Sequence, residues 1–337
     1  MPAEPPPPDP DRALAPLAAH DALLLAVSGG PDSIALALLA ARWPLRTQKR
    51  IEIATVDHGL RAEAAQEAAQ VGEWARGLGF AHHILRWEGE KPSTRIQERA
   101  REARYRLLCE RAREIGATGI VTAHHADDQA ETVLFRLTRG SGIAGLAAMA
   151  GESRIDGLAL LRPLLGFRKA ELERLCAEAD HPFFRDPSNE NPAYARVRLR
   201  RLAVTLAAEG LDAAALLRLR ARAARAEEAL AWSAARAASE LPAERGEGRF
   251  RIEAEALRTL PREMLLRLLA AEIVRIGGGA PRLERLERAG ERLADALARE
   301  TRFKTTLGGA TVLFEGGAVA ISPEPPRHRD GARNEGA

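Results

Sequence analysis

The sequence contains few cysteines, aromatic residues and lysines, and these shortages narrow the classes of protein to which it can belong. Its two cysteines, Cys109 and Cys176, lie far apart in segments with helical periodicity and form no C-x-x-C pair. Neither a disulfide framework nor a cysteine-ligated iron–sulfur cluster is indicated, and we expect two reduced packing residues. Aromatic residues make up 4% of the chain, and arginine far outnumbers lysine among the 50 basic residues. This arginine bias fits a GC-rich genome and RNA binding equally well.

A long apolar run and a strong excess of one charge are also missing. No apolar stretch approaches the roughly 18 residues of a membrane span, and the N-terminal MPAEPPPPDPD lacks the basic and apolar regions of a secretory signal. The 50 basic and 47 acidic side chains leave a formal charge of +3. This net charge is too small to indicate a polyanionic partner by itself. These features predict a soluble, cytoplasmic protein without membrane association.

Length and composition predict more than one structural unit. At 337 residues, 46% of them apolar, the chain exceeds the usual size of one compact domain and can form substantial cores. We expect a disordered leader over residues 1–16, a first domain over 17–206, a mainly helical region over 207–325 and a disordered tail over 326–337. The domain boundary is placed near residues 206–211.

The first part of the chain alternates short apolar runs with longer amphipathic ones. Candidate strands are LLLAV (residues 23–27), IEIATV (51–56), AHHILRW (81–87) and TGIVTA (118–123), and the segments between them have apolar residues at helical spacing. This alternation predicts an α/β fold with a Rossmann-like, mostly parallel sheet and helices on both faces. In such sheets ligands bind beyond the carboxyl ends of the strands.

Beyond residue 149 the pattern becomes mainly helical. A strand-like GLALLRPLL precedes helices over about 169–180 and 211–239. A short strand over 249–255 and two more helices follow. In the last segment, stretches that alternate apolar and polar residues are separated by glycines. This predicts a helical C-terminal region that ends in a small β element. Residues 194–225 also hold eight arginines against two acidic side chains, a density that suits contacts with RNA phosphates or a solvated helix face.

The turn SGGPDS, residues 28–33, follows the first predicted strand. Gly29 and Gly30 allow backbone conformations closed to other residues, and the next helix presents unpaired N–H groups with a partial positive charge. Such a turn binds phosphate, with hydroxyl donors from its serines and a divalent cation beside Asp32. It is neither a Walker loop nor GxGxxG. A plain turn capped by Asp32 or Ser33 is the alternative, but the position after the first strand favours the phosphate site.

Two further polar clusters follow predicted strands. Asp57 and His58 close the second strand, where a residue commonly meets the adenosine of a nucleotide, although His58 fits a buried, hydrogen-bonded histidine equally well. HHADDQAET, residues 124–132, begins a helix, and Asp128 with Glu131 fits a capping box. These acids can also hold magnesium or an ammonium group. A transition-metal site made of the two histidines and Asp128 matches no strong template.

An ordered set of motifs resembles a known family. SGGPDS is similar to the SGGxDS signature of the N-type ATP pyrophosphatases, or PP-loop enzymes, which cleave ATP between the α and β phosphates to adenylate a substrate oxygen. The whole set resembles the bacterial tRNA(Ile)-lysidine synthetases. Its members are SGGPDS (28–33), VDHGLR (56–61), AREARY (100–105), HHADDQAET (124–132), RGSGIAGL (139–146), RPLL (162–165) and DPSN (186–189).

The resemblance implies an adenine nucleotide alpha hydrolase-like fold and a two-step reaction. Residues 17–206 would form the catalytic domain and 207–325 a tRNA-binding region. ATP with magnesium adenylates the oxygen at position two of the wobble cytidine in an isoleucine tRNA with a CAU anticodon. Free lysine then displaces AMP to leave lysidine, which pairs with adenine and changes the charging of the tRNA from methionine to isoleucine. Related enzymes also suggest a homodimer.

The resemblance further assigns roles to individual residues. The residues implied in phosphate binding are those of the turn: Ser28, Gly29, Gly30, Pro31, Asp32 and Ser33. Asp32 would hold magnesium, Arg104 would offset charge near the α-phosphate, and Asp128 and Glu131 would recognise lysine. Arg104 also fits an exposed helix arginine. The residues implied in tRNA binding are Arg196, Arg198, Arg200 and Arg201. Val197 departs from the RNxxR pattern of the family, which has asparagine there.

Two other functions stay open on the sequence alone. A related PP-loop enzyme that thiolates tRNA also adenylates a pyrimidine. Relatives that work through persulfide or an iron–sulfur cluster need clustered cysteines, and Cys109 and Cys176 form no such cluster. A noncatalytic tRNA-binding module could have lost Asp32, Asp128 or Glu131, and all three are present. Nucleotide-independent tRNA binding without release of pyrophosphate would favour that module.

Overall fold

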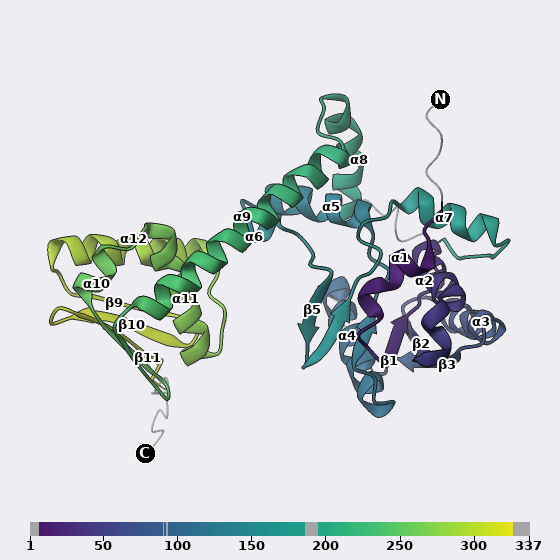
Figure 1. The fold of residues 1–337 in the computed structure, drawn as a ribbon, viewed down its shortest axis with the longest axis horizontal. Coiled ribbons are helices and arrows are strands. Elements are labelled where there is room, and N and C mark those ends of the chain that lie inside the picture. Colours follow the sequence, from purple (N-terminus) through teal and green to yellow (C-terminus); the bar gives the residue numbers. More distant parts are fainter. Residues whose placement is uncertain (1–6, 90, 92–93, 186–194, 326–337) are drawn as a thin grey trace, which may run out of the picture. The chain divides into compact units, whose positions relative to one another are not determined.

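The chain forms two compact units in the computed structural model, which describes residues 7–89, 91, 94–185 and 195–325 (Figure 1). One unit comprises Met1–Gly140 with Ala144–Ala223, and the other Ser141–Ile143 with Ala224–Ala337. The predicted tail and the DPSN motif lie outside the described residues.

The predicted domain boundary, residues 206–211, lies where one helix ends and the next begins. These are α8 (Ala195–Ala208) and α9 (Ala213–Glu240). The division between the two units falls later, between Ala223 and Ala224. The assignment of a catalytic domain and a tRNA-binding region on either side of residues 206–211 stays a prediction.

A six-stranded sheet with strand order β3-β2-β1-β4-β6-β5 forms the centre of the first unit. Its strands are β1 (Ala22–Ala26), β2 (Arg50–Asp57), β3 (Ala81–Arg86), β4 (Gly119–Val121), β5 (Glu152–Ile155) and β6 (Leu158–Leu161). Neighbouring strands are parallel, except that β5 pairs antiparallel with β6. The predicted Rossmann-like, mostly parallel sheet is confirmed. The sequence analysis missed β5, because its four residues have no buried apolar face.

Helices cover both faces of this sheet because its central strand is apolar on both sides. Leu23 and Leu25 of β1 belong to one buried cluster and Leu24 to another, as expected for side chains that alternate across a strand. The first cluster includes residues of α2 (Pro31–Arg42), α3 (Ala64–Gly77) and α7 (Lys169–Glu178). The second includes residues of α4 (Ile96–Glu114). Cys109 of α4 and Cys176 of α7 are free and buried, which confirms their prediction as packing residues.

The N-terminal segment is ordered where the sequence analysis expected disorder. α1 (Pro10–Leu14) and the 3-10 helix η1 (Ala15–Leu17) precede β1, and the Asp9 side chain caps α1 by accepting a hydrogen bond from the Arg12 N–H at 2.9 Å. Leu14 and Leu17 are at most 1% exposed and belong to the first cluster. The predicted disorder was therefore wrong for residues 10–16, because these few apolar side chains pack against α2, a contact that composition does not reveal. Residues 1–6 lie outside the described residues.

Leu14→Ala should destabilise the first unit by about 2–5 kcal/mol, because it removes a completely buried side chain and leaves a cavity. Denaturant unfolding of the full chain measures this change. Leu60→Ala is the matched control, since Leu60 is 42% exposed and its truncation should cost less than about 1 kcal/mol. Equal stability of Leu14→Ala and the parent protein would contradict the placement of α1 in the core.

A helical layer follows β4 in the chain. It contains α5 (Ala126–Leu137), the short α6 (Ile143–Leu146), α8 and the first turns of α9. α5 packs against α8 and α9 through an apolar cluster that includes Val133, Leu199 and Leu216. Val197, the departure from the family pattern, is 7% exposed. An apolar residue therefore suits this position in the structure.

The second unit contains a five-stranded antiparallel sheet with strand order β7-β8-β11-β10-β9. Its elements are β7 (Ala243–Gly246), β8 (Arg249–Glu253), α10 (Ala254–Arg258), α11 (Arg262–Gly277), α12 (Leu283–Arg299), β9 (Phe303–Leu307), β10 (Ala310–Glu315) and β11 (Ala318–Pro323). The predicted helices and terminal sheet are confirmed, although the mostly exposed β7 was missed. Within the described ranges, no helix is long and apolar enough to cross a membrane.

Candidate active site

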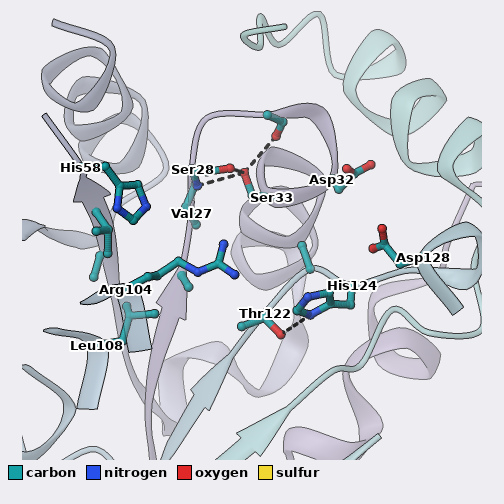
Figure 2. A pocket seen from close by; sticks show the side chains of 15 residues that line it. Val27, Ser28, Asp32, Ser33, His58, Arg104, Leu108, Thr122, His124 and Asp128 are labelled. Atoms are coloured by element: carbon teal, nitrogen blue, oxygen red, sulfur yellow. Dashed lines mark hydrogen bonds between the residues drawn. The ribbon is translucent and has the colours of Figure 1, made fainter. Parts of the chain in front are cut away.

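A cavity of about 240 Å³ lies at the carboxyl ends of β1, β2 and β4 (Figure 2). Sequence-predicted residues from separate segments meet there: Ser28, Gly30, Asp32, Ser33, His58, Arg104 and Asp128. Carboxyl ends of parallel strands share one edge of a sheet, which explains why motifs distant in the sequence converge. Thr122 and His124, which follow β4, also line this cavity.

The conformation of the turn after β1 depends on its first glycine, Gly29. Gly29 has φ +89°, and a Cβ atom added there would lie 2.8 Å from side-chain carbons of both Phe184 and Val71. The Gly29 carbonyl also accepts a hydrogen bond from the Phe184 N–H at 2.9 Å. The backbone is therefore clamped in a conformation that favours glycine, with no room for a side chain.

Two serines fix the rest of this turn. Ser33 Oγ accepts a hydrogen bond from the Ser28 N–H at 3.1 Å and donates to the Gly30 carbonyl at 2.9 Å. α2 begins at Pro31, and no side chain caps its N-terminus. The N–H groups of that first turn and the positive end of the helix dipole are thus available to an anion. This arrangement supports the phosphate-binding interpretation of SGGPDS.

The carboxylate of Asp32 lies in the first turn of α2 and lines the cavity. Its Oδ1 is buried and makes no hydrogen bond among the described residues. Its Oδ2 lies 3.5 Å from His125 Nε2. No group of three or more histidine, cysteine or acidic residues in the described part of the chain could hold a metal ion by itself. A lone buried carboxylate oxygen beside a phosphate-binding turn fits a cation that arrives together with phosphate oxygens.

His125 lies among three carboxylates. Its Nε2 is 3.5 Å from Asp128 Oδ2 as well as from Asp32 Oδ2, and its Nδ1 is 3.6 Å from Asp127 Oδ2. Burial opposes a charge on this imidazole, yet the hydrogen bond to Asp32 and the charges of Asp128 and Asp127 outweigh it and raise the pKa of His125. Burial is the main cause that raises the pKa of Asp128. His125 was not singled out by sequence reasoning as the bridge between these acids.

The capping arrangement differs from the predicted one. The His125 N–H donates to Asp128 Oδ2 at 3.1 Å, and α5 starts at Ala126, so Asp128 lies in its first turn. The prediction that Asp128 is the cap residue with Glu131 as its partner was wrong by one turn. Glu131 is therefore not needed at the helix terminus.

His124 stays neutral at physiological pH. Burial, aided by the positive charges of Arg104, Arg162 and Arg101, lowers the pKa of His124 to about 3. Its Nδ1 forms a 2.8 Å hydrogen bond with Thr122 Oγ1, and both side chains face the cavity (Figure 2). Arg104 lies on one side of the cavity, and Asp32 and Asp128 lie on the other (Figure 2).

Arg104, His58 and Asp57 are the other residues that the sequence predicts for the nucleotide site. The Arg104 guanidinium points into the cavity (Figure 2). His58 lines the cavity edge-on to Trp87, with ring centroids 6.0 Å apart, and its Nδ1 is buried without a hydrogen bond among the described residues. Burial lowers the pKa of His58. Asp57 Oδ1 instead accepts the Gly59 N–H at 2.9 Å, so Asp57 shapes the turn behind the cavity.

Glu131 and Arg200, predicted for lysine and tRNA respectively, contact each other. Arg200 Nη2 donates to Glu131 Oε2 at 3.0 Å, and Arg200 Nε donates to Glu131 Oε1. Arg198 and Arg201 are exposed on the same helix, α8, while the side chain of Arg196 lies outside the described part. The pairing of Glu131 with Arg200 could not be read from the sequence, because the two residues belong to separate motifs.

Comparisons with known proteins agree with these features. Residues 10–207 match the family described as a PP-loop domain. The chain is 51% identical to a protein named tRNA(Ile)-lysidine synthase from Methylobacterium sp. (strain 4-46), over 91% of this chain and 90% of the relative. It is 49% identical to the protein of that name from Rhodopseudomonas palustris, over 92% of each. The solved structure of U34-tRNA thiolase NcsA from Methanococcus maripaludis with its 4Fe-4S cluster shares the fold, with a TM-score of 0.50 and 16% identity over 60% of this chain and 72% of that one.

Proposed function

The chain belongs to the tRNA(Ile)-lysidine synthase family of ATP-dependent ligases, and from this premise we propose how its cavity carries out the reaction. The enzyme joins free lysine to the wobble cytidine of the isoleucine tRNA with a CAU anticodon. ATP first adenylates the oxygen at position two of that base and releases pyrophosphate. The side-chain amine of lysine then displaces AMP and leaves lysidine.

The turn after β1 binds the β and γ phosphates of ATP in this proposal. The first N–H groups of α2 and the hydroxyl of Ser28 face the anion, and Ser33 keeps the turn in shape. Asp32 would hold the magnesium ion that accompanies ATP through its buried Oδ1. Charge on the departing pyrophosphate is thereby balanced as the bond to the α-phosphate breaks.

Arg104 and His58 complete the nucleotide side of the cavity. The Arg104 guanidinium, directed into the cavity, offsets charge at the α-phosphate. His58 and the turn formed by Asp57 lie where the second strand ends, and they receive the adenosine. Because the pKa of His58 is lowered, its imidazole is neutral beside the base.

The acidic side of the cavity receives lysine. Asp128 lines the cavity, and Glu131, which pairs with Arg200, follows one turn later on α5. Carboxylates suit a substrate that carries an ammonium group. A lysine amine must lose its proton before it attacks, and a carboxylate that holds the ammonium can accept that proton.

The tRNA contacts the arginines that lie outside the cavity. Arg198 and Arg201 of α8 are exposed, and together with Arg196 and Arg200 they form the basic run assigned to tRNA in this proposal. Contacts with phosphates make binding fall steeply with salt. The arginines of α9 and the second unit extend this role, and two copies of the chain form a homodimer in the cytoplasm.

A thiolation reaction is disfavoured by the two cysteines. Both are buried in helices of separate segments, α4 and α7, whereas relatives that use persulfide or an iron–sulfur cluster need clustered thiols. A noncatalytic module is disfavoured by Asp32, whose buried Oδ1 has no hydrogen-bond partner within the ranges that the structure describes. This oxygen is the single observation that carries the proposal of a catalytic ATP site.

Incorporation of labelled lysine tests the proposed function. With ATP and magnesium, the purified chain should attach lysine to an isoleucine tRNA with a CAU anticodon and release one pyrophosphate per lysine. An anticodon variant of the same tRNA is the control and should receive no label. Pyrophosphate release without lysine incorporation would show that adenylation occurs but that the nucleophile is another compound. Binding of tRNA without either product would favour the noncatalytic module.

A further inference from the structure

Arg101 and Tyr105 of the AREARY motif and Arg162 of the RPLL motif form a cluster beside the cavity. The guanidinium carbon of Arg101 lies 5.0 Å from the centroid of the Tyr105 ring. Besides burial and Arg104, the charges of Arg162 and Arg101 lower the pKa of His124, a residue that lines the cavity. These three residues, here called the arginine cluster, therefore belong to the surroundings of the cavity although they do not line it.

The direction of α4 places this cluster at the mouth of the cavity. Arg101, Arg104 and Leu108 follow one another at helical spacing and share one face of α4. Arg104 and Leu108 line the cavity (Figure 2). Because α4 connects the parallel strands β3 and β4, it begins at the carboxyl edge of the sheet. Arg101 is exposed and one turn nearer to this beginning, so it lies further toward solvent than Arg104.

The arginine cluster carries positive charge without an acidic partner. Among the residues that the structure describes, no acidic side chain forms an ion pair with Arg101 or Arg162. Arg162 Nη1 donates to neutral acceptors, the Ala150 carbonyl at 2.9 Å and Ser153 Oγ at 3.0 Å. Burial and the charge of Arg101 lower the pKa of Arg162, although Tyr105 opposes them. An anion would relieve this repulsion between like charges.

The same cluster holds polar groups that lack an acceptor. Arg162 Nε and the Tyr105 hydroxyl are both buried, and neither makes a hydrogen bond within the described ranges. Tyr105 as a whole is 7% exposed. Folded proteins satisfy most of their buried polar groups. A ligand with several acceptor oxygens would supply what the cluster lacks.

The reaction determines which anion reaches the mouth of the cavity. An enzyme that modifies a base takes the base out of its stack into a pocket, while the backbone of the nucleic acid stays outside. The phosphates of ATP are already assigned to the turn after β1 and to Arg104. The anion that remains for the mouth is a phosphodiester of the tRNA, and arginine matches its oxygens in geometry and charge.

We propose that Arg101 and Arg162 bind a phosphodiester next to the target cytidine and so hold the tRNA backbone at the mouth while the base enters the cavity. The inference rests on the proposed function and adds to it a contact within the first unit, separate from the arginines of α8 and α9. Tyr105 is a positioning residue, because Arg101 lies over its ring. A contact of this kind fixes the register of the tRNA and reads no base.

Arg101→Gln is the direct test, because Arg101 is exposed and its substitution leaves the core untouched. In the full-length chain the KM for tRNA should rise about tenfold, as expected for the loss of a hydrogen bond to a charged group. The KM for ATP at saturating tRNA should stay within about twofold. In direct binding of the tRNA, the slope of log affinity against log salt concentration should fall by about 0.7–0.9, the effect of one lost phosphate contact.

Arg106→Gln is the matched control. Arg106 is also exposed on α4, but it pairs with Glu110 at 2.9 Å and faces away from the shared face of Arg101 and Arg104. Its substitution removes the same charge from the same helix. The KM for tRNA and the salt dependence of binding should therefore stay within about twofold of the parent values.

A neutral linkage in the tRNA identifies the phosphate. Two tRNAs are needed, with a single methylphosphonate on the 5′ side or on the 3′ side of the target cytidine. One of them should raise the KM of the parent about tenfold but that of Arg101→Gln less than twofold, because the variant has already lost the contact. Arg162→Gln should behave in the same way. Denaturant unfolding accompanies this variant, since Arg162 also bonds to Ala150 and Ser153, and Arg101→Gln decides if its stability is reduced.

The proposal is overturned if both neutral linkages weaken the parent and Arg101→Gln equally. It is also overturned if Arg101→Gln raises the KM for ATP and leaves that for tRNA unchanged, because the cluster then serves the nucleotide. Failure of the proposed function looks different. In that case the parent protein itself releases no pyrophosphate and incorporates no lysine with any of these tRNAs.

Discussion

Asp32→Asn should lower tRNA-dependent pyrophosphate release by about 10²- to 10³-fold while leaving the fold intact. The change keeps the shape of the side chain but removes its charge. Asp32 Oδ1 is a buried oxygen that makes no hydrogen bond with any residue the structure describes. Loss of one preorganised electrostatic contact to a developing charge costs this much in other enzymes. The measurement is pyrophosphate release from ATP at increasing magnesium concentrations, and the variant should require more magnesium than the parent.

Asp127→Asn is the matched control for this experiment. Asp127 also lies close to His125, but its oxygens are already engaged by Arg168 Nη1 at 3.3 Å and by the Lys169 N–H at 2.8 Å. Its substitution should therefore change the rate less than tenfold and leave the magnesium requirement unaltered. Equal losses in the two variants would mean that the acidic cluster acts as a whole, and the magnesium role of Asp32 would have to be given up.

The fold was predictable where a local pattern determines the element. The run LLLAV has no polar face, and its short length and the glycines that follow it favour a strand buried on both sides. The other parallel strands follow from the regular alternation of strand and helix. α1 and β5 could not be predicted in this way. The few apolar residues of α1 become a core only through long-range packing on α2, and β5 is held by hydrogen bonds to β6 instead of by an apolar face.

The cavity was predictable to the extent that parallel topology brings strand ends together. Asp32, His58, Arg104 and Asp128 come from four segments, and the cavity unites them. The contacts between side chains were not predictable. A sequence motif shows that Glu131 is acidic and that Arg200 is basic, but their pairing depends on how α8 packs on α5.

Gly29→Ala should destabilise the first unit by about 2–5 kcal/mol and raise the KM for ATP at least tenfold. Two costs add up. A left-handed conformation such as φ +89° costs an L-residue about 1–2 kcal/mol, and a Cβ atom 2.8 Å from carbons of Phe184 and Val71 adds about 1–3 kcal/mol of overpacking. Relief of this clash must move the turn, which displaces the N–H groups of α2 from the phosphates. Denaturant unfolding and ATP-dependent pyrophosphate release measure the two effects.

Gly30→Ala distinguishes strain in the turn from obstruction of the cavity. Gly30 has φ −72°, and the nearest atom to an added Cβ is Ser28 Oγ at 3.7 Å, so its substitution should change the free energy of unfolding by less than about 1 kcal/mol. Gly30 lines the cavity, and a methyl group there can weaken ATP binding without affecting the fold. A stability loss confined to Gly29→Ala therefore assigns the two glycines different tasks. The first keeps the turn clamped between α3 and Phe184, and the second keeps the approach to the helix terminus clear. Equal stability of both variants would show that the contacts of Gly29 do not hold the turn.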